Sequence, residues 1–423
     1  MILSRRNFLK TVLAMPLGVA LFSRLFAHYE ALAAPLRGRV KITAIKAMQV
    51  GNRTPIKIET DSGFVGYGPS MSSGPSLATG PYVRDVIREF SANEGSTAGL
   101  TLIGKDPLDI QVHHFNMFYA YPQRTRHFTV LAGIDIALWD LAGNILGQPV
   151  SKLLGGNFRT EIPLYSHCGH TGNFWDKAEW QDRAQKLKET PEGFKAFKVD
   201  LNDAMGTIAR RFIPSLGPQD VRKVGLCYEL AREAFGPDYD IDVHCHNELD
   251  TGSAIQVAKA IENIKPLWYE DPLAPYFSES WVALRKATSV PLMVGENLEL
   301  IDDALPFIQN QTVDCLQPDL VQSGGITAVK RMADLAAYYR MPVCLHNVGG
   351  YFLNMASMQW TAAVHNAPRL ECAQGSSKPV EAAGNAPVIK NGVMQVSTLP
   401  GLGYVLNEDY LKKNMAPGET WWG

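Results

Sequence analysis

Short apolar runs alternate with stretches of helical periodicity from about residue 162 into the late part of the chain. The runs are "FKAFKVDL", "YDIDVHCH", "PLWYEDPL", "PLMVGENL", "DCLQPDL", "MPVCLHN" and "RLECAQG", and polar residues appear toward the end of each. From Asp242 through Glu270, Glu296, Asp319 and His346 to Glu371, these polar residues stand 28, 26, 23, 27 and 25 positions apart. Each interval has room for one strand and one helix. The pattern predicts a parallel barrel of eight strands or one fewer.

The chain before this region follows other patterns. Residues 38–68 read as strands with a hairpin-like turn at residues 61–63, and residues 69–82 are rich in Gly, Ser and Pro. Apolar residues at helical spacing predict a helix from about Val130 to Leu146. The tail after about Gly384 has strand and turn patterns again. We expect this tail to return to the first domain.

The first 33 residues have the features of a targeting segment. "SRRNFLK" precedes the apolar run Thr11 to Phe22, and "ALA" occupies residues 31–33. A charged region, an apolar region and a small-residue cleavage site are typical of a signal peptide. The arginine pair resembles a twin-arginine export signal, so we expect an exported, periplasmic protein. An ordinary signal peptide and a membrane anchor are the alternatives.

Composition excludes some classes of function. The 423 residues are 46% hydrophobic and 19% charged, as in an ordinary globular protein, and the net charge is −2. This balance gives no electrostatic reason to expect nucleic acid or an acidic membrane surface as a partner. No segment after the signal has the pattern of a membrane span. The six cysteines form no CxxC pair, and we expect no disulfide framework.

Carboxylates follow three successive predicted strands. In a parallel barrel the functional residues lie at the carboxyl ends of the strands. Asp242, Glu270 and Glu296 occupy such ends and can converge on one cation. Oxygen-only ligands suit Mg²⁺. Any one of these acids alone reads better as part of a structural ion pair, but their shared strand phase favours the metal site.

Two further strand ends carry residues suited to proton transfer. Asp319 precedes His346 by one strand, so the aspartate can hold one ring nitrogen and leave the other free as a base. Lys198 lies on the strand before Asp242 and can neutralise a substrate carboxylate or a developing enolate. The alternatives are a core histidine and a solvated lysine.

Several motifs together resemble the enolase superfamily, and within it the mandelate racemase-like branch. They are "AGIDIALWDLAGNILGQPVSKLLGG" at residues 132–156, "WYEDPL", "GENL", "LQPDLVQSGGIT" and the terminal "LPGLG". The resemblance implies a modified (β/α)₈ barrel under an α+β capping domain built from both chain ends. It also implies Mg²⁺ on Asp242, Glu270 and Glu296, and removal of a proton next to a carboxylate. We divide the chain into a signal (1–33), a capping domain (38–160), a barrel (161–384) and a returning segment (385–423).

The chain departs from the racemase pattern on two strands. Asp200 stands where the second lysine of a Lys-x-Lys motif is expected. The next strand carries Asp242-Val243-His244, which resembles the galactonate- and mannonate-type acid-sugar dehydratases. That resemblance implies dehydration of an aldonate to a 2-keto-3-deoxy acid. His346 would remove the C2 proton and His244 would protonate the leaving C3 hydroxyl, or the reverse for another stereochemistry.

Other polar residues receive less definite interpretations. In the dehydration that the resemblance implies, Glu371 would hydrogen-bond the substrate carboxylate. Asp200 is either a site residue or an ion-pair partner of Lys198, and His246 is expected to support the site from its rim. The remaining candidates are Arg124, Arg126 and His127 in the capping region, and His167, His170 and Trp175 after the first barrel strand.

Three other functions are compatible with parts of the pattern. His244-Cys245-His246 is a His-x-His motif, which zinc-dependent amidohydrolases use on a barrel strand. A racemase or epimerase could use His244 and His346 on opposite faces of a 2-hydroxy acid. A non-catalytic sugar-acid binding protein is the third alternative. We expect a small-molecule acid-sugar substrate and a homo-oligomer, whereas the specific sugar is not predicted.

Overall fold

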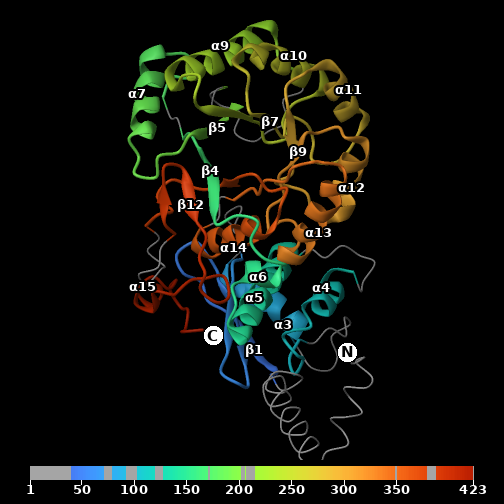
Figure 1. Cartoon of the computed structure of the whole chain (residues 1–423), viewed down its shortest axis with the longest axis vertical. Helices are drawn as coiled ribbons and strands as arrows, with labels where there is room; N and C mark the ends of the chain where they lie inside the picture. Colours follow the sequence, from blue (N-terminus) through green and yellow to red (C-terminus); the bar gives the residue numbers. More distant parts are fainter. Residues whose placement is uncertain are drawn as a thin grey trace, which may run out of the picture.

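The computed structural model describes residues 40–70, 79–91, 102–119, 127–169, 172–201, 205, 215–347, 350–378 and 387–422. The expected signal at residues 1–33 lies outside the described residues, as do Arg124, Arg126 and His170. A mostly parallel sheet with outer helices is accompanied by a smaller unit containing an antiparallel sheet (Figure 1). The predicted fold class, a modified barrel with an α+β capping domain, is therefore confirmed.

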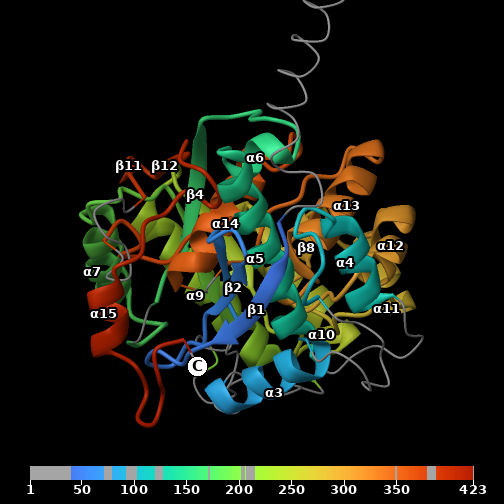
Figure 2. The same cartoon turned by 90° about the horizontal axis from the view of Figure 1, so that it is seen from below.

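The capping domain is built on three antiparallel strands. They are β1 (Ile42–Ala47), β2 (Ile56–Thr60) and β3 (Val65–Gly68), and the predicted turn at residues 61–63 joins β2 to β3. The accompanying helices are α3 (Gly80–Ser91), α4 (Ile110–Phe118), α5 (Phe128–Leu146) and α6 (Val150–Leu153). A Cβ atom on Gly68 would lie 2.0 Å from the carbonyl oxygen of Gly133, so α5 approaches the sheet at glycines (Figure 2).

Helix α5 corresponds to the helix expected from about Val130 to Leu146. It is apolar on most sides because the sheet, the neighbouring helices and the barrel all pack against it. In length and composition it could cross a membrane, but 78% of its apolar window is buried inside the structure. This burial is that of a core helix in a globular protein.

Parallel strands close into a ring of eight positions. The named strands are β4 (Glu161–His167), β5 (Ala196–Asp200), β6 (Asp240–His244), β7 (Trp268–Glu270), β8 (Leu292–Val294), β9 (Cys315–Leu316) and β10 (Leu370–Glu371). Each pairs in parallel with the next from β4 to β9, and β10 pairs in parallel with β4. Residues 343–346 fill the remaining position through single parallel bridges to both neighbours. The spacing of polar strand ends thus predicted the barrel correctly.

Helices surround this ring and cover its strands (Figure 1). They are α7 (Lys177–Lys188), α9 (Pro218–Phe235), α10 (Thr251–Ile261), η1 (Glu262–Ile264), α11 (Glu279–Ala287), α12 (Ile301–Asn310), α13 (Gly325–Tyr338) and α14 (Gly350–Ala363). Apolar residues of the strands and helices form one large buried cluster between them. Burial of this apolar surface is the main stabilising contribution to the barrel.

A separate buried cluster fills the middle of the ring. Its members are Tyr165, Ala196, Trp268, Met293, Cys315 and Cys344, which come from six different strand positions. Alternate residues on a strand share a face, so the side chains two residues further on point into the same interior nearer the carboxyl ends. Lys198, Glu270 and His346 occupy those positions. The apolar cluster is therefore the floor of a polar site.

The chain end contacts both parts of the molecule. Strands β11 (Ile389–Lys390) and β12 (Val393–Gln395) form a hairpin, and β12 pairs antiparallel with the first half of β4. Leu411 of helix α15 (Glu408–Lys413) and Trp422 beyond it pack against Met48 and Val50 of the capping domain. The domain limits at residues 160 and 384 remain a prediction.

Candidate active site

The register of neighbouring strands brings the polar strand ends to two levels of the barrel. Lys198 lies opposite Asp242, and Asp200 lies opposite His244. His244 in turn lies opposite Glu270 on the next strand. Side chains at paired positions of adjacent parallel strands lie side by side. Residues that are 26 and 44 positions apart in the sequence are thereby gathered into one site.

Lys198 and two carboxylates form a buried ion-pair group. Its Nζ lies 2.7 Å from Oε1 of Glu270 and 3.1 Å from Oε1 of Glu371. Burial lowers the pKa of Lys198, but the charges of Glu270 and Glu371 outweigh it and raise that pKa well above its ordinary value. The lysine therefore remains an ammonium group. Glu371, on β10, also accepts a hydrogen bond from the backbone N–H of Asn347.

Asp242 has a different environment. Both of its carboxylate oxygens are buried, and neither has a hydrogen-bond partner among the described residues. Burial and the neighbouring charge of Glu270 raise the pKa of Asp242 well above its ordinary value. A buried carboxylate without a donor is unfavourable unless a cation or a proton is present. The donor set therefore fits a hard divalent cation.

The other two predicted ligands lie close to the histidines. Ligand atoms of His244, Glu270 and Glu296 all lie within 4.8 Å of one another, so Asp, Glu and His side chains form a possible metal-binding site here. Asp242 lies outside this close group, which includes His244 instead. The ligand set Asp242, Glu270 and Glu296 remains a prediction, supported by the unpaired oxygens of Asp242.

His346 forms the expected pair with Asp319. Its Nδ1 donates to Oδ2 of Asp319 over 2.8 Å, while Oδ1 of Asp319 accepts the backbone N–H groups of Val321 (2.7 Å) and Gln322 (3.2 Å). Nε2 of His346 is thus left to face Oε2 of Glu296 at 3.5 Å. Burial lowers the pKa of His346, but the bond to Asp319 and nearby carboxylates raise it to about 9.

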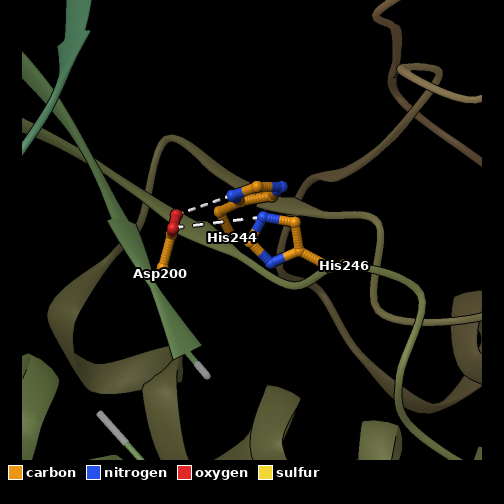
Figure 3. A group of neighbouring side chains, drawn as sticks. All are labelled: Asp200, His244 and His246. Carbon is orange, nitrogen blue, oxygen red and sulfur yellow. Dashed lines mark hydrogen bonds and ion pairs between the residues drawn. The ribbon is translucent and has the colours of Figure 1, made fainter. Parts of the chain in front are cut away.

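His244 forms a second pair of the same kind, with Asp200. Its Nδ1 donates to Oδ1 of Asp200 over 2.7 Å (Figure 3). Its Nε2 lies 3.3 Å from Oε1 of Glu270 and 3.6 Å from Oε2 of Glu296. Although burial raises the pKa of Asp200, the charge of His244 and the bond from His167 hold it far below its ordinary value. Of the two interpretations of Asp200, the structure favours the site residue, since its contacts are with histidines and not with Lys198.

His246 lies beside this second pair. Its ring centroid is 4.1 Å from that of His244, and its Nε2 is 4.0 Å from Oδ2 of Asp200 (Figure 3). Burial first, and the charge of His244 next, lower the pKa of His246 to about 4, so its ring is neutral near pH 7. These contacts agree with a supporting role at the site.

The remaining candidates are divided between the site and other surroundings. Nε2 of His167 lies 2.9 Å from Oδ2 of Asp200, so this histidine belongs to the site. Trp175 instead lies under the ammonium group of Lys223, and His127 bonds with the hydroxyl of Tyr82 in the capping domain.

One contributor escaped sequence reasoning. Gln317 donates from Nε2 to Oε2 of Glu270 over 2.9 Å and lies 2.7 Å from the hydroxyl of Tyr165. It orients the carboxylate that Lys198 holds from the other side. Its position two residues before Asp319 gave a weak signal, because an amide in a buried strand needs partners.

Comparisons with known proteins agree with this geometry. The family model described as "Mandelate racemase / muconate lactonizing enzyme, N-terminal domain" matches residues 31–155, and "Enolase C-terminal domain-like" matches residues 179–410. The D-xylonate dehydratase of Haloferax volcanii is 30% identical over 398 residues, which span 91% of this chain and 92% of the relative. The D-gluconate dehydratase of Thermoproteus tenax is 28% identical over 85% of this chain and 69% of its own length.

Solved structures give the same result. A mandelate racemase/muconate lactonizing enzyme-like protein from Rubrobacter xylanophilus superimposes with a TM-score of 0.78 at 28% identity, covering 90% of this chain and 99% of that one. The second family model alone spans more than half of the chain. The chain therefore belongs to the mandelate racemase and muconate lactonizing enzyme family of the enolase superfamily.

Proposed function

We propose that the chain is a Mg²⁺-dependent dehydratase of an aldonate and that its product is a 2-keto-3-deoxy acid. The observation that carries the proposal is the pair of His–Asp dyads. His346 and His244 each donate from Nδ1 to an aspartate, and their Nε2 atoms approach Oε2 of the same Glu296 at 3.5 and 3.6 Å. Elimination requires one group to remove a proton and another to protonate a leaving hydroxyl, which this arrangement supplies.

Asp242, Glu270 and Glu296 would hold the cation. When bound, a divalent cation supplies Lewis acidity to the substrate carboxylate and so makes the neighbouring C–H bond more acidic. The buried ammonium group of Lys198 stabilises the negative charge that develops when the C2 proton leaves. Glu371 holds this ammonium group in place from β10.

The two dyads divide the proton transfers. Asp319 fixes the tautomer of the neutral His346 ring, and in this deprotonated form Nε2 of His346 accepts the proton from C2. Asp200 fixes His244 likewise, and Nε2–H of His244 donates its proton to the C3 hydroxyl, which leaves as water. The enol that remains becomes the 2-keto acid by taking up a proton at C3 and losing the proton of its C2 hydroxyl. The two histidines exchange roles for a substrate of the other configuration.

The names of the relatives support the reaction and the substrate class. Relatives that match most of this chain are dehydratases of D-xylonate, D-gluconate and D-mannonate. All three substrates are aldonates with hydroxyl groups at C2 and C3. The zinc hydrolase alternative finds no support in these matches. Epimerisation remains the second candidate because two histidines facing one point could also exchange a proton between two faces.

A substrate screen tests the proposal. The purified protein, with Mg²⁺, is incubated with aldonates of four to six carbons and assayed for 2-keto acids. We expect one aldonate or a few of related configuration to give a keto acid, and chelation of the metal to abolish the product. Inversion at C2 without any keto acid would instead establish the epimerase.

We also propose that residues 1–33 direct export to the periplasm and that the protein is a homo-oligomer. The arginine pair of Arg5 and Arg6 motivates the first proposal. Replacing both residues by lysine should retain a fused reporter in the cytoplasm. Sedimentation of the purified protein tests the second proposal, and a monomer at micromolar concentration would contradict it.

A further inference from the structure

His167 stands at the end of a chain of hydrogen bonds that leads to His244. It is the last residue of β4, and its side chain is 39% exposed. Nε2 of His167 lies 2.9 Å from Oδ2 of Asp200, whose other oxygen accepts from Nδ1 of His244 over 2.7 Å. Two histidines thus bind the two oxygens of one carboxylate, and one of them continues into the site.

The hydrogen bond that His167 accepts at Nδ1 decides which of its ring nitrogens donates to Asp200. The backbone N–H of Gly169 donates to Nδ1 of His167 over 3.0 Å, so Nδ1 is an acceptor. In a neutral ring the hydrogen then resides on Nε2, which donates to Asp200. Gly169 has a φ of +58°, in the left-handed region, and Arg183 donates to the carbonyl of Cys168 beside it. The turn that orients His167 is therefore itself anchored.

Asp319 and Asp200, the two aspartates of the site, accept hydrogen bonds from different kinds of donor. Asp319 accepts two backbone N–H groups besides His346. Among the described residues, Asp200 accepts hydrogen bonds from the side chains of His167 and His244, while His246 is 4.0 Å away. The orientation of Asp200, and hence of the His244 ring, depends on a side chain, whereas that of Asp319 depends on the backbone.

We propose that His167 is a positioning residue that orients Asp200 and, through it, His244, and that it acts on the elimination step and not on proton removal at C2. The inference rests on the proposed dehydration, in which His244 protonates the leaving hydroxyl. His167 pairs with Lys198 in the register of β4 and β5, but in the part of the chain that the structure describes no side-chain hydrogen bond or ion pair joins His167 to Lys198 or to His346. We therefore expect the removal of the C2 proton not to depend on His167.

Three variants of the full chain test this inference. His167→Ala removes the donor, and His167→Gln retains an N–H donor near the position of Nε2. His365→Ala removes an exposed histidine whose ring packs at a tilt against that of Phe158, and it serves as the matched control. Each variant is incubated in deuterated water with Mg²⁺ and the aldonate found by the screen. Keto acid formation and deuterium at C2 of the recovered substrate are both measured.

We expect His167→Ala to lower kcat for keto acid formation about tenfold to 100-fold, as is usual for residues that orient a reacting group. The ratio of C2 deuteration to keto acid should rise at least about tenfold, since the C2 proton is still removed and then returned. His167→Gln should recover most of the loss, and His365→Ala should match the unaltered protein.

Other outcomes overturn the inference. An unchanged kcat in His167→Ala shows that Asp200 needs no second donor. Equal loss of exchange and elimination shows a general structural effect, and a glutamine variant as poor as the alanine variant shows that the N–H donor is irrelevant. If His167→Ala does not fold, His167→Leu fills the space and also lacks the donor. An unaltered protein that forms no keto acid refutes the proposed function itself, which is a separate result.

Discussion

At the scale of single residues, the site has two histidines with the same inner geometry. Each directs Nε2 toward Glu296 because Nδ1 is bound to an aspartate. The proposed reaction nevertheless gives them different roles, since His346 removes a proton and His244 donates one, and their other contacts differ as well. His244 also approaches Glu270, whereas His346 lies on the segment that neighbours β10, the strand of Glu371. Substitution of each should therefore affect a different step.

His346→Ala should abolish both C2 hydrogen exchange and keto acid formation, whereas His244→Ala should abolish only the second. Loss of a positioned acid or base lowers the rate about 10²- to 10⁴-fold. Proton NMR in deuterated water follows both signals in one sample. Normal turnover in His244→Ala would contradict dehydration by this histidine.

Asp242→Asn should weaken Mg²⁺ binding and at the same time stabilise the metal-free protein. Removing one carboxylate charge relieves the repulsion between Asp242 and Glu270, which raises the pKa of Asp242. Thermal unfolding with and without Mg²⁺ measures both effects, and the increase in Tm on adding the ion should shrink. Asp302→Asn, on the exposed first turn of α12, is the control and should leave that increase unchanged. An equal increase in both variants would argue against Asp242 as a ligand.

Sequence reasoning identified most of these residues but not all of their partners. Glu270, Glu296, Asp319 and His346 were recognisable because each ends a strand at a regular interval. The bond from Asp200 to His244 depends on the register between β5 and β6, which periodicity along one strand does not reveal. To predict the contact of Asp200 with His167, one would also need to know where the side chain of His167 points on a third strand, β4.

At the scale of elements, α5 and α13 join the capping domain to the barrel. The backbone N–H of Thr327, in the first turn of α13, donates to Oδ2 of Asp135 on α5 over 3.0 Å. Trp139, one turn later on α5, donates to the hydroxyl of Thr327. A carboxylate at a helix N-terminus is favourable, but Asp135 is fully buried. Burial raises the pKa of Asp135 to about 7, although hydrogen bonds from Thr327 oppose the increase.

The pKa of Asp135 predicts a pH dependence of stability. Its folded-state pKa lies above the unfolded value, so the folded state binds the proton more tightly. The resulting stabilisation is present below pH 4 and is lost as pH rises through about 7. Asp135→Asn should therefore gain stability relative to the unaltered protein between pH 5 and pH 8, by a few degrees in Tm. A difference in Tm that does not vary with pH would show that Asp135 is not titrating.

Long elements were predicted better from the sequence than short ones. Helix α5 is 19 residues long, and the expected helix from about Val130 to Leu146 lies within it. Strand β9 has two residues, and residues 343–346 are linked to the barrel only by isolated bridges. Such segments owe their position to the neighbours that pair with them, so their own sequence carries little strand signal. This is why the count of eight strands or one fewer could not be narrowed further.

At the scale of the whole molecule, the last residues tie the chain end to the capping domain. Trp422 is 4% exposed and packs with Met48, Val50 and Leu411. Trp421 beside it is only partly buried and lies under the ammonium group of Lys412. Trp422→Ala should lower the free energy of unfolding by about 3 kcal/mol, and Trp421→Ala by clearly less. Denaturant unfolding compares the two, and equal effects would contradict the packing described for Trp422.

The pairing of β12 with β4 has a consequence for how the protein is made. Gln395 and Glu161, joined across this pair, are 234 positions apart. The ribosome therefore releases the first barrel strand long before the strand that completes its edge exists. Contacts between such distant segments slow folding, and the barrel cannot close until β10, at residues 370–371, has been synthesised. Until β10 and β12 have been made, β4 of a nascent chain carries an unpaired edge, and such an edge favours association with other chains.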